Sequence, residues 1–354
     1  RPAWQRVSAT RRQPPRHRLA RVARFAVLGA TSWGLTLAWL LHRTGNSVTV
    51  ITRSEAEAEA VRRQRGLARL PELLLPDAIA VVPAPAPAGL DGVVIAVPAR
   101  AVRETLDAAG GSRETPLLLA AKGVESQPGE PSRLLSEMLC ALGWPAERVA
   151  VVSGPNLAHE VVRGLPAAAV VAARPVSGAE RWQKALSGGT FRVYSSDDVV
   201  GVELAAALKN VIAIAAGAAW GMEFGANAVS MILTRGLAEM TRLGVAMGAS
   251  PATFQGLAGV GDLAATCFSP LSRNRRFGER LGRGEMPDSA ATAIGETIEG
   301  ARTAAIALEF GARYGVELPI CATVAAVVGG QQTVMEAMAK LLARPLKPEA
   351  AWPS

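Results

Sequence analysis

Short runs of β-branched and aliphatic residues alternate with helical segments in the first part of the chain, and their length is typical of buried strands. These runs occupy residues 24–28, 47–52, 92–97, 117–120 and 150–153. The first two enclose a glycine-containing turn and a helix predicted at 35–43. A strand, a helix and a second strand in this order require a right-handed crossover and a parallel sheet. We therefore predict an α/β domain with a mostly parallel sheet over residues 23–194.

The pattern changes near residue 195, after which strand signals nearly vanish and helical segments follow one another. Helices are predicted at 199–220, 227–247, 251–258, 272–281, 297–314, 323–328 and 332–342. We therefore predict a second, all-helical domain over residues 195–343, and a chain of 354 residues accommodates two domains. Residues 1–22 are expected to form a disordered basic arm, and residues 344–354 a loose tail.

The positive charge of the chain is concentrated at its start. The net charge is +8, but residues 1–24 hold eight arginines and no acidic residue, so that 38 − 8 = 30 basic residues face 30 acidic ones in the remainder. A neutral body lacks the electrostatic footprint of a nucleic-acid-binding protein. The arm is compatible with a transit peptide, an upstream start-codon artefact or a tether to an anionic surface.

Residues 25–41 form an uncharged stretch directly after the arm, as a signal sequence would. This stretch has only 17 residues and is interrupted by Gly29, Thr31, Ser32 and Gly34, whereas a spanning helix needs about 20 mainly apolar residues. We therefore expect a cytoplasmic protein without stable membrane insertion. The three cysteines and three histidines are widely separated, so we predict no metal site.

The turn after the first predicted strand resembles a dinucleotide-binding motif. The pattern G-x-G-x-x-G brings backbone N–H groups and a helix N-terminus against a pyrophosphate. Here the turn reads GATSWG from Gly29 to Gly34, so Thr31 replaces the second glycine and is expected to crowd the pyrophosphate. The flanking strands favour a Rossmann-like domain over an ordinary strand–helix turn. Arg53 follows the second strand, where a cation suits the 2′-phosphate of NADPH; a solvated loop residue is the alternative.

Two other predicted strands are followed by polar residues. Lys122 follows the strand 117–120, and Gly154 and Asn156 follow the strand 150–153. Open α/β sheets bind ligands at the carboxyl ends of their strands, so these residues are candidates for a binding site. An ordinary loop lysine and a helix-capping asparagine are the alternatives.

Lys209 is exceptional because it lies in a predicted helix that is apolar nearly all round. An unpaired buried ammonium group costs about 3–5 kcal/mol, so a lysine in this position is expected to be paired or used chemically. Glu203 is a possible structural partner, but positions i and i+6 do not share a helix face. Lys209 is therefore a candidate catalytic residue.

Two later segments complete the candidate site. Asp262 ends the tight turn GVGD, and Thr266 lies four residues further on, hence on the same face if a helix starts there. Asp262 could equally be a helix N-cap. Residues 272–276 (SRNRR) open a predicted helix, whose free N–H groups and arginines would bind a phosphate; a solvated basic face is the alternative.

These residues lie in stretches that resemble the bacterial-type NAD(P)-dependent glycerol-3-phosphate dehydrogenases. The similarity spans about residues 23–343 and includes AAKGVES, SGPNLA, FRVYSSDDVVGVELAAALKNVIAIAAG, GVGDLAATC, LSRNRRFG and IGETIEG. The resemblance implies a Rossmann domain joined to a helical substrate domain. It also implies NADPH, or alternatively NADH, as the cofactor and reversible reduction of dihydroxyacetone phosphate to sn-glycerol 3-phosphate for glycerophospholipid synthesis.

The motifs and the resemblance together imply roles for individual residues. Lys209, Lys122 and Asp262 would be catalytic, with Lys209 as general acid and electrophile, while the helix start at 272–274 would hold the substrate phosphate. The substrate-binding residues would be Lys122, Gly154, Asn156, Lys209, Asp262, Thr266, Ser272, Arg273 and Asn274. The cofactor-binding residues would be Gly29, Ser32, Trp33, Gly34, Arg53, Lys122, Ala158, Arg273, Thr297 and Glu299.

Two other functions stay open. A related two-domain reductase could act on a different small oxo-acid, and the loss of the second glycine at Thr31 would suit a protein that senses dinucleotides without catalysis. The phosphorylated triose is the expected partner, and a homodimer is compatible with the sequence.

Overall fold

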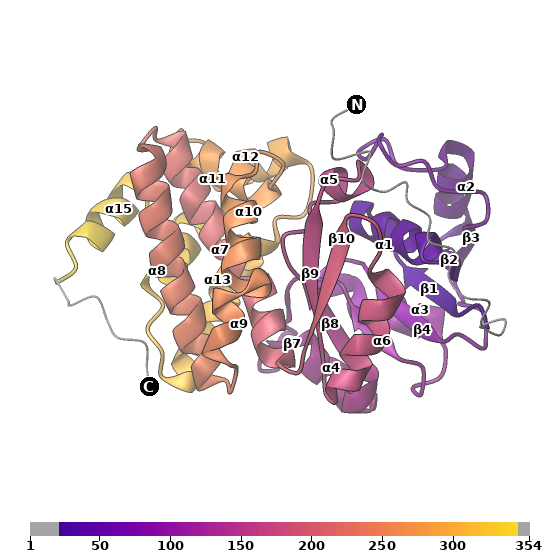
Figure 1. Cartoon of the computed structure of the whole chain (residues 1–354). Coiled ribbons are helices and arrows are strands. Elements are labelled where there is room, and N and C mark those ends of the chain that lie inside the picture. The colour runs from indigo at the N-terminus through magenta and orange to yellow at the C-terminus, as the bar shows by residue number, and fades with distance from the viewer. Residues whose placement is uncertain (1–20, 346–354) are drawn as a thin grey trace.

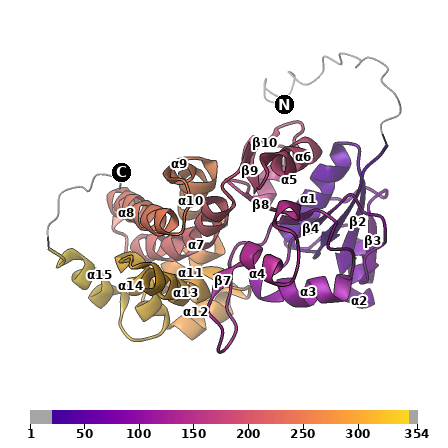
Figure 2. The same cartoon turned by 90° about the horizontal axis from the view of Figure 1, so that it is seen from below.

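The computed structural model describes residues 21–345 and consists of a sheet-containing half followed by a helical half (Figure 1). Residues 1–20 of the predicted arm and 346–354 of the predicted tail lie outside the described residues. The view from below in Figure 2 shows the two halves side by side, with strands in the first and helices alone in the second. The predicted fold class is confirmed.

The first half contains an eight-stranded sheet with the order β10-β9-β8-β5-β4-β1-β2-β3. Its strands are β1 Arg24–Leu28, β2 Ser47–Thr52, β3 Ala80–Pro83, β4 Gly92–Ile95, β5 Leu117–Leu119, β8 Val149–Ser153, β9 Ala167–Ala173 and β10 Phe191–Ser196. All neighbouring pairs are parallel except β8 and β9. From β1 the strand order proceeds to β2 and β3 on one side, and it continues from β4 on the other side. The strand order therefore reverses between β1 and β4, and open sheets bind ligands at such a point.

Helices cover both faces of this sheet, which explains why its strands are apolar at successive positions. Phe25 and Val27 of β1 belong to one core and Ala26 and Leu28 to another. The longer helices of this half are α1 Ser32–Arg43, α2 Glu55–Gln64, α3 Val102–Ala109, α4 Leu135–Ala141, α5 Ala158–Val162 and α6 Val176–Leu186. Short 3₁₀ turns lie at η2 Ala99–Ala101 and η3 Ala146–Arg148.

The helical half is built around α7, which runs from Val199 to Gly221 and contacts most of the other helices. The others are α8 Gly225–Ala246, α9 Pro251–Gln255, α10 Asp262–Phe268, α11 Arg273–Gly282, α12 Pro287–Ile294, α13 Glu299–Tyr314, α14 Pro319–Val328 and α15 Val334–Leu342. Within the described residues, α7 alone is long and apolar enough to cross a membrane, yet 83% of that stretch is buried inside the protein. It is the central helix of the second core.

Several predicted helix boundaries were wrong for local reasons. The helix predicted at 35–43 begins at Ser32, because the Thr31 hydroxyl caps it. The helix predicted at 251–258 ends at Gln255 and gives way to a π-helical turn, η4, from Leu257 to Gly261. Helix α12, which begins at a proline, was not predicted.

A two-stranded hairpin from the first half contributes to the core of the second. Strands β6 (Val124–Glu125) and β7 (Arg133–Leu134) pair antiparallel directly after Lys122 and Gly123. Their apolar side chains pack in the core formed by the helices, and the backbone N–H of Ser132 donates to Glu309 of α13 at 2.8 Å. The segment that follows Lys122 is thus anchored to the helical half.

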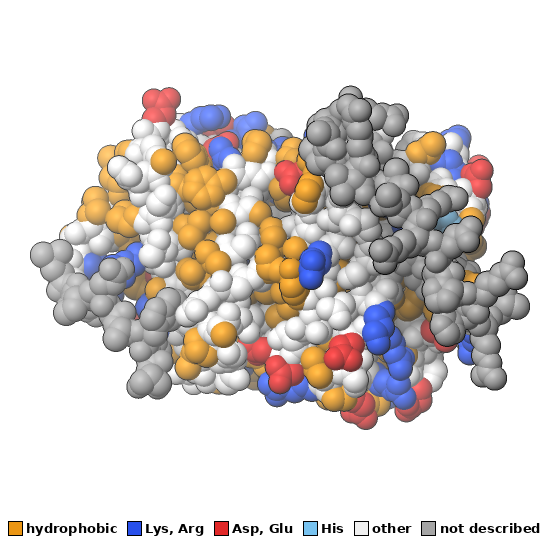
Figure 3. Space-filling view, in the orientation of Figure 1, with side chains coloured by type: hydrophobic (Ala, Val, Ile, Leu, Met, Phe, Trp, Pro, Cys, Tyr) orange, Lys and Arg blue, Asp and Glu red, His pale blue; other side chains and the backbone are white. Residues whose placement is uncertain are grey.

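Hydrophobic side chains gather on the surface of the helical half in the view of Figure 3, while charged groups lie mainly near its edges. Exposed examples from this half include Phe224, Met231 and Phe268. The expected homodimer stays a prediction.

Glu203 of α7 is a buried carboxyl group at the contact between the two halves. It does not pair with Lys209 but accepts hydrogen bonds from the hydroxyl and the backbone N–H of Ser136 on α4. Burial raises the pKa of Glu203 to about 7, in opposition to these hydrogen bonds. The structural pairing of Glu203 with Lys209, considered from the sequence, is therefore wrong.

We expect the free energy of unfolding to fall as pH rises from 5 to 8, by up to about 3 kcal/mol through Glu203. The folded protein binds the Glu203 proton more tightly than the unfolded chain does. The resulting stabilisation is fully present below the unfolded pKa and is lost as pH rises through about 7. Glu203→Gln, which imitates the protonated form, should reduce this dependence in urea unfolding, while the part due to Glu239, whose pKa burial also raises to about 7, remains. The exposed Glu180→Gln variant is the control; an identical slope in both variants would refute the assignment.

Candidate active site

A cavity of about 940 Å³ lies between the carboxyl ends of the central strands and helices of the second half. Its walls include Ala96 after β4, Ala120 after β5, and side chains from α7, α10 and α11. A volume of this size is typical of a site for a cofactor or a comparable small molecule. Ten of the predicted site residues line it: Ser32, Trp33, Lys122, Asn156, Ala158, Lys209, Asp262, Arg273, Thr297 and Glu299.

The dinucleotide turn requires its first and third glycines for close packing. Gly29 has φ +105°, and a Cβ atom there would lie 2.5 Å from Val97 Cγ1. A Cβ atom on Gly34 would lie 2.2 Å from the carbonyl oxygen of Gly29. Neither glycine lines the cavity, so both act on the shape of the turn. Thr31 takes a different role, since its hydroxyl donates to Ala96 O at 2.7 Å and accepts from Gly34 N at 3.0 Å.

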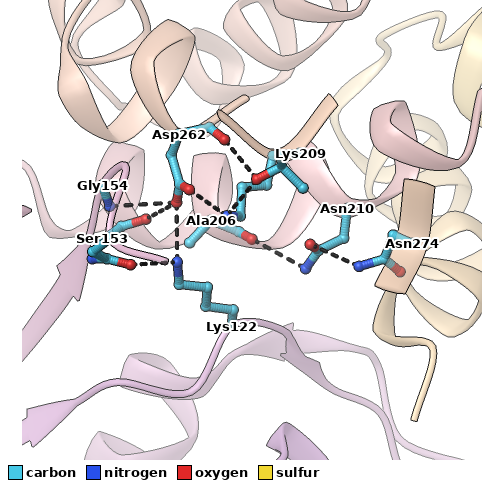
Figure 4. A network of polar contacts seen from close by, with 10 residues as sticks. Lys122, Ser153, Gly154, Ala206, Lys209, Asn210, Asp262 and Asn274 are labelled. Carbon is cyan, nitrogen blue, oxygen red and sulfur yellow. Dashed lines mark hydrogen bonds and ion pairs between the residues drawn. The ribbon is translucent and has the colours of Figure 1, made fainter. Parts of the chain in front are cut away.

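Lys209 is buried on α7 and directed at Asp262, the first residue of α10 (Figure 4). Its ammonium group forms an ion pair with Asp262 and donates to Thr266 Oγ1 at 2.9 Å. The Thr266 hydroxyl in turn donates to the backbone oxygen of Asp262 at 2.6 Å. Asp262 makes no N-cap contact, so the capping alternative is wrong: its carboxylate pairs with the buried lysine instead.

The carboxylate of Asp262 also holds groups from the sheet. Its Oδ2 atom accepts from Lys122 Nζ at 3.1 Å, from Ser153 Oγ at 2.9 Å and from the backbone N–H of Gly154 at 3.3 Å (Figure 4). Gly154 thus lies beside the cavity without lining it. Two lysines from different halves of the protein converge on one buried aspartate, which gives the cluster a net charge of about +1 when all three groups are ionised.

Burial and the neighbouring charges shift the pKa of Lys209 and of Asp262. Burial lowers the pKa of Lys209 to about 8, although Asp262 opposes the shift. Burial also acts against ionisation of Asp262, but the ammonium groups of Lys122 and Lys209 outweigh it and lower the pKa of the carboxyl group. At neutral pH the cluster therefore holds an ionised aspartate and a Lys209 that is charged yet able to release its proton.

Asn156 contributes an amide to the same cavity. Its Oδ1 atom accepts from Lys122 Nζ at 3.3 Å, while its buried Nδ2 atom has no hydrogen-bond partner among the described residues. Asn156 does not cap α5, whose N-cap residue is Leu157 without a side-chain contact. The capping alternative is wrong, and the free Nδ2 donor suits a ligand.

The start of α11 is organised by internal hydrogen bonds. The Ser272 hydroxyl caps the helix by accepting from Arg275 N at 3.2 Å. The Asn274 side chain donates to Asn210 Oδ1 and accepts from Gly300 N, each at 3.0 Å. Neither Ser272 nor Asn274 lines the cavity, whereas Arg273 does. Their side chains fix the helix start, and the N–H groups of its first turn that are not taken by the cap are available to an anion.

The position of Arg53 differs from the prediction, and three charged or titratable residues at the cavity were not predicted. Arg53 does not line the cavity; its side chain is 89% exposed and lies 3.6 Å from Glu57. Three charged or titratable residues that do line the cavity were not predicted, namely Arg69, His159 and Glu296. They lie in connecting segments and on helix surfaces, where a single charged residue gives no signal in the sequence.

Two family models together match most of the chain. The model of the N-terminal part of NAD-dependent glycerol-3-phosphate dehydrogenase matches residues 24–179, and that of the C-terminal part matches residues 198–339.

Individual proteins agree with these matches. The chain is 43% identical to the glycerol-3-phosphate dehydrogenase [NAD(P)+] of Halorhodospira halophila over 92% of its own length and 98% of the relative's. It is 44% identical to the enzyme of the same name from Corynebacterium jeikeium, with 92% and 99% covered. The crystal structure of glycerol-3-phosphate dehydrogenase from Coxiella burnetii superposes with a TM-score of 0.82 at 32% identity, covering 91% of this chain and 99% of that one. The chain belongs to the NAD-dependent glycerol-3-phosphate dehydrogenase family.

Proposed function

We propose that this protein catalyses the reversible, NAD(P)H-dependent reduction of dihydroxyacetone phosphate to sn-glycerol 3-phosphate. The observation that carries the proposal is the buried Lys209 ammonium group, held by Asp262 at a cavity that also contains the dinucleotide turn. Burying charged groups costs free energy, and clusters of buried charged groups with shifted pKa values are typical of catalytic and binding sites.

The residues at the turn fit a dinucleotide. The Ser32 and Trp33 side chains line the cavity at the N-terminus of α1, whose positive end favours a pyrophosphate. Lys122, Ala158, Thr297 and Glu299 lie along the same cavity and would complete the cofactor site. When bound, NAD(P)H supplies the hydride.

Lys209 would act on the oxygen of the substrate carbonyl. Its ammonium group stabilises negative charge on that oxygen and can then donate a proton, for which a pKa of about 8 is well matched to neutral pH. Asp262 orients this group, and Lys122 adds a second positive charge nearby. Arg273 and the first N–H groups of α11 would hold the phosphate of the substrate. The position of the carbonyl group would then be fixed through this phosphate at the other end of the molecule.

Turnover with purified protein tests the proposal. Oxidation of NADPH should require dihydroxyacetone phosphate, and dihydroxyacetone without the phosphate should be a poor substrate. Comparable turnover of a non-phosphorylated oxo-acid would favour the related reductase, and cofactor binding without turnover of any phosphorylated ketone would favour a sensor. We further propose a cytoplasmic enzyme whose product enters glycerophospholipid synthesis.

The preference for NADPH is expected to depend on Arg53. Its guanidinium group is exposed at the end of β2, where a 2′-phosphate would lie. Arg53→Gln should lower kcat/KM for NADPH by about tenfold, the effect of one charged hydrogen bond, and leave that for NADH nearly unchanged. Arg63→Gln on α2 is the matched control. Equal values for wild type and Arg53→Gln with both cofactors would make Arg53 an ordinary surface residue.

A further inference from the structure

Arg69 reaches the dinucleotide turn from the segment that connects α2 to β3. Its Nε atom donates to Ser32 Oγ at 3.1 Å, and both residues line the large cavity. Within residues 21–345 this is the single hydrogen bond of the Arg69 side chain, and no carboxylate pairs with it. The remaining guanidinium N–H groups are therefore free to bind an anion.

The segment that carries Arg69 is fixed on both sides of this residue. Leu70 is fully buried in the core beneath the sheet face that α1 covers. The Glu72 carboxylate is hydrogen-bonded to the His159 ring on α5, with 3.0 Å between Oε2 and Nδ1, and His159 also lines the cavity. Because its neighbours are anchored, Arg69 is held at the turn before any ligand arrives, which reduces the entropic cost of binding.

The turn itself offers fewer contacts to a pyrophosphate than the complete motif. Thr31 occupies the position of the glycine that lets the backbone approach the phosphates. Its hydroxyl already donates to Ala96 O and accepts from Gly34 N, so it has no donor left for a ligand. The N–H groups of Ser32 and Trp33 remain at the start of α1, because the first N–H groups of a helix lack an intrahelical acceptor.

We propose that Arg69 binds the pyrophosphate of NAD(P)H and replaces the close backbone contact that Thr31 obstructs. A guanidinium group beside Ser32 adds positive charge and forked donors at the end of α1 that already favours an anion. The inference rests on the proposed use of NAD(P)H. It differs from the role of Arg53, since a pyrophosphate is present in both NADH and NADPH whereas the 2′-phosphate is present in one.

Binding measurements separate these two roles. Dissociation constants for NADH, NADPH and ADP-ribose are measured by calorimetry with wild type, Arg69→Gln, Arg69→Lys and Arg53→Gln. Arg181→Gln, an exposed substitution on α6 outside the cavity, is the matched control. Arg69→Gln should raise all three constants by the same factor, about 10–100-fold for the loss of a charged hydrogen bond. Arg69→Lys should lose less affinity for the three ligands than Arg69→Gln does. In both variants the KM for the triose phosphate at saturating cofactor should not change.

Other outcomes overturn the inference. Unchanged affinity of Arg69→Gln for NADH and ADP-ribose would show that Arg69 only orients Ser32. A loss of affinity for NADPH alone would show that Arg69 binds the 2′-phosphate and not the pyrophosphate. If wild type bound neither cofactor, the proposed function would fail together with this inference, whereas tight binding by wild type and Arg69→Gln alike would refute this inference alone.

Discussion

Replacing Lys209 by alanine is expected to lower kcat for the reduction of dihydroxyacetone phosphate by about 10²–10⁴-fold, the usual contribution of a positioned general acid. The substitution removes both the positive charge and the proton donor from the cavity. The KM should change far less, because the phosphate would be held by Arg273 and the start of α11. Steady-state kinetics at pH 7 measures both constants.

The pH profile gives a second readout for Lys209. Burial lowers its pKa to about 8, so the protonated acid is present below that pH and lost above it. The reductive kcat of wild type should therefore decline as pH rises through about 8, and Lys209→Ala should lack this decline. Lys184→Ala, an exposed substitution on α6, is the control for the loss of a lysine. Wild-type rates in Lys209→Ala would exclude a catalytic role.

The cost of burying a charge explains why Lys209 could be found from the sequence. A lysine within a run of apolar helical residues is conspicuous, because few proteins maintain such a group without a partner. The partner could not be identified in the same way, since Asp262 lies 53 residues away and only the packing of α10 against α7 joins them. The strand–turn–helix order around Gly29 likewise predicted the parallel sheet.

Side chains whose partners are distant were harder to interpret. Ser272 and Asn274 were assigned to the substrate, yet the structure uses their side chains to cap α11 and to connect it with Asn210 and Gly300. Ser153, which donates to Asp262, follows the last apolar residue of β8 and carries no signal of its own. Arg69 was missed because its contact with Ser32 spans 37 residues. Local patterns predict elements, but contacts between elements depend on the packed fold.

Replacing Asp262 by asparagine is expected to destabilise the protein and to reduce its activity. The substitution leaves two ammonium groups, Lys122 and Lys209, without their shared counter-ion in a buried site. Removing one partner of a buried ion pair costs about 3–5 kcal/mol. We therefore expect the unfolding free energy of Asp262→Asn at pH 7 to be about 3 kcal/mol below that of wild type. Without the carboxylate, burial and Lys122 lower the pKa of Lys209 further, so the alkaline decline of kcat should move to lower pH.

The stability loss in Asp262→Asn should itself depend on pH. Once Lys209 is neutral it no longer needs a counter-ion. The difference in unfolding free energy between Asp262→Asn and wild type, measured with denaturant, should therefore become smaller as pH rises from 6.5 to 9. A double variant, Lys209→Met with Asp262→Asn, should recover part of the loss, because the two residues are directly coupled. Asp77→Asn, whose side chain is exposed beside Arg65, is the surface control. Strictly additive effects in the double variant would show that the two groups do not share the interaction on which the proposed proton transfer depends.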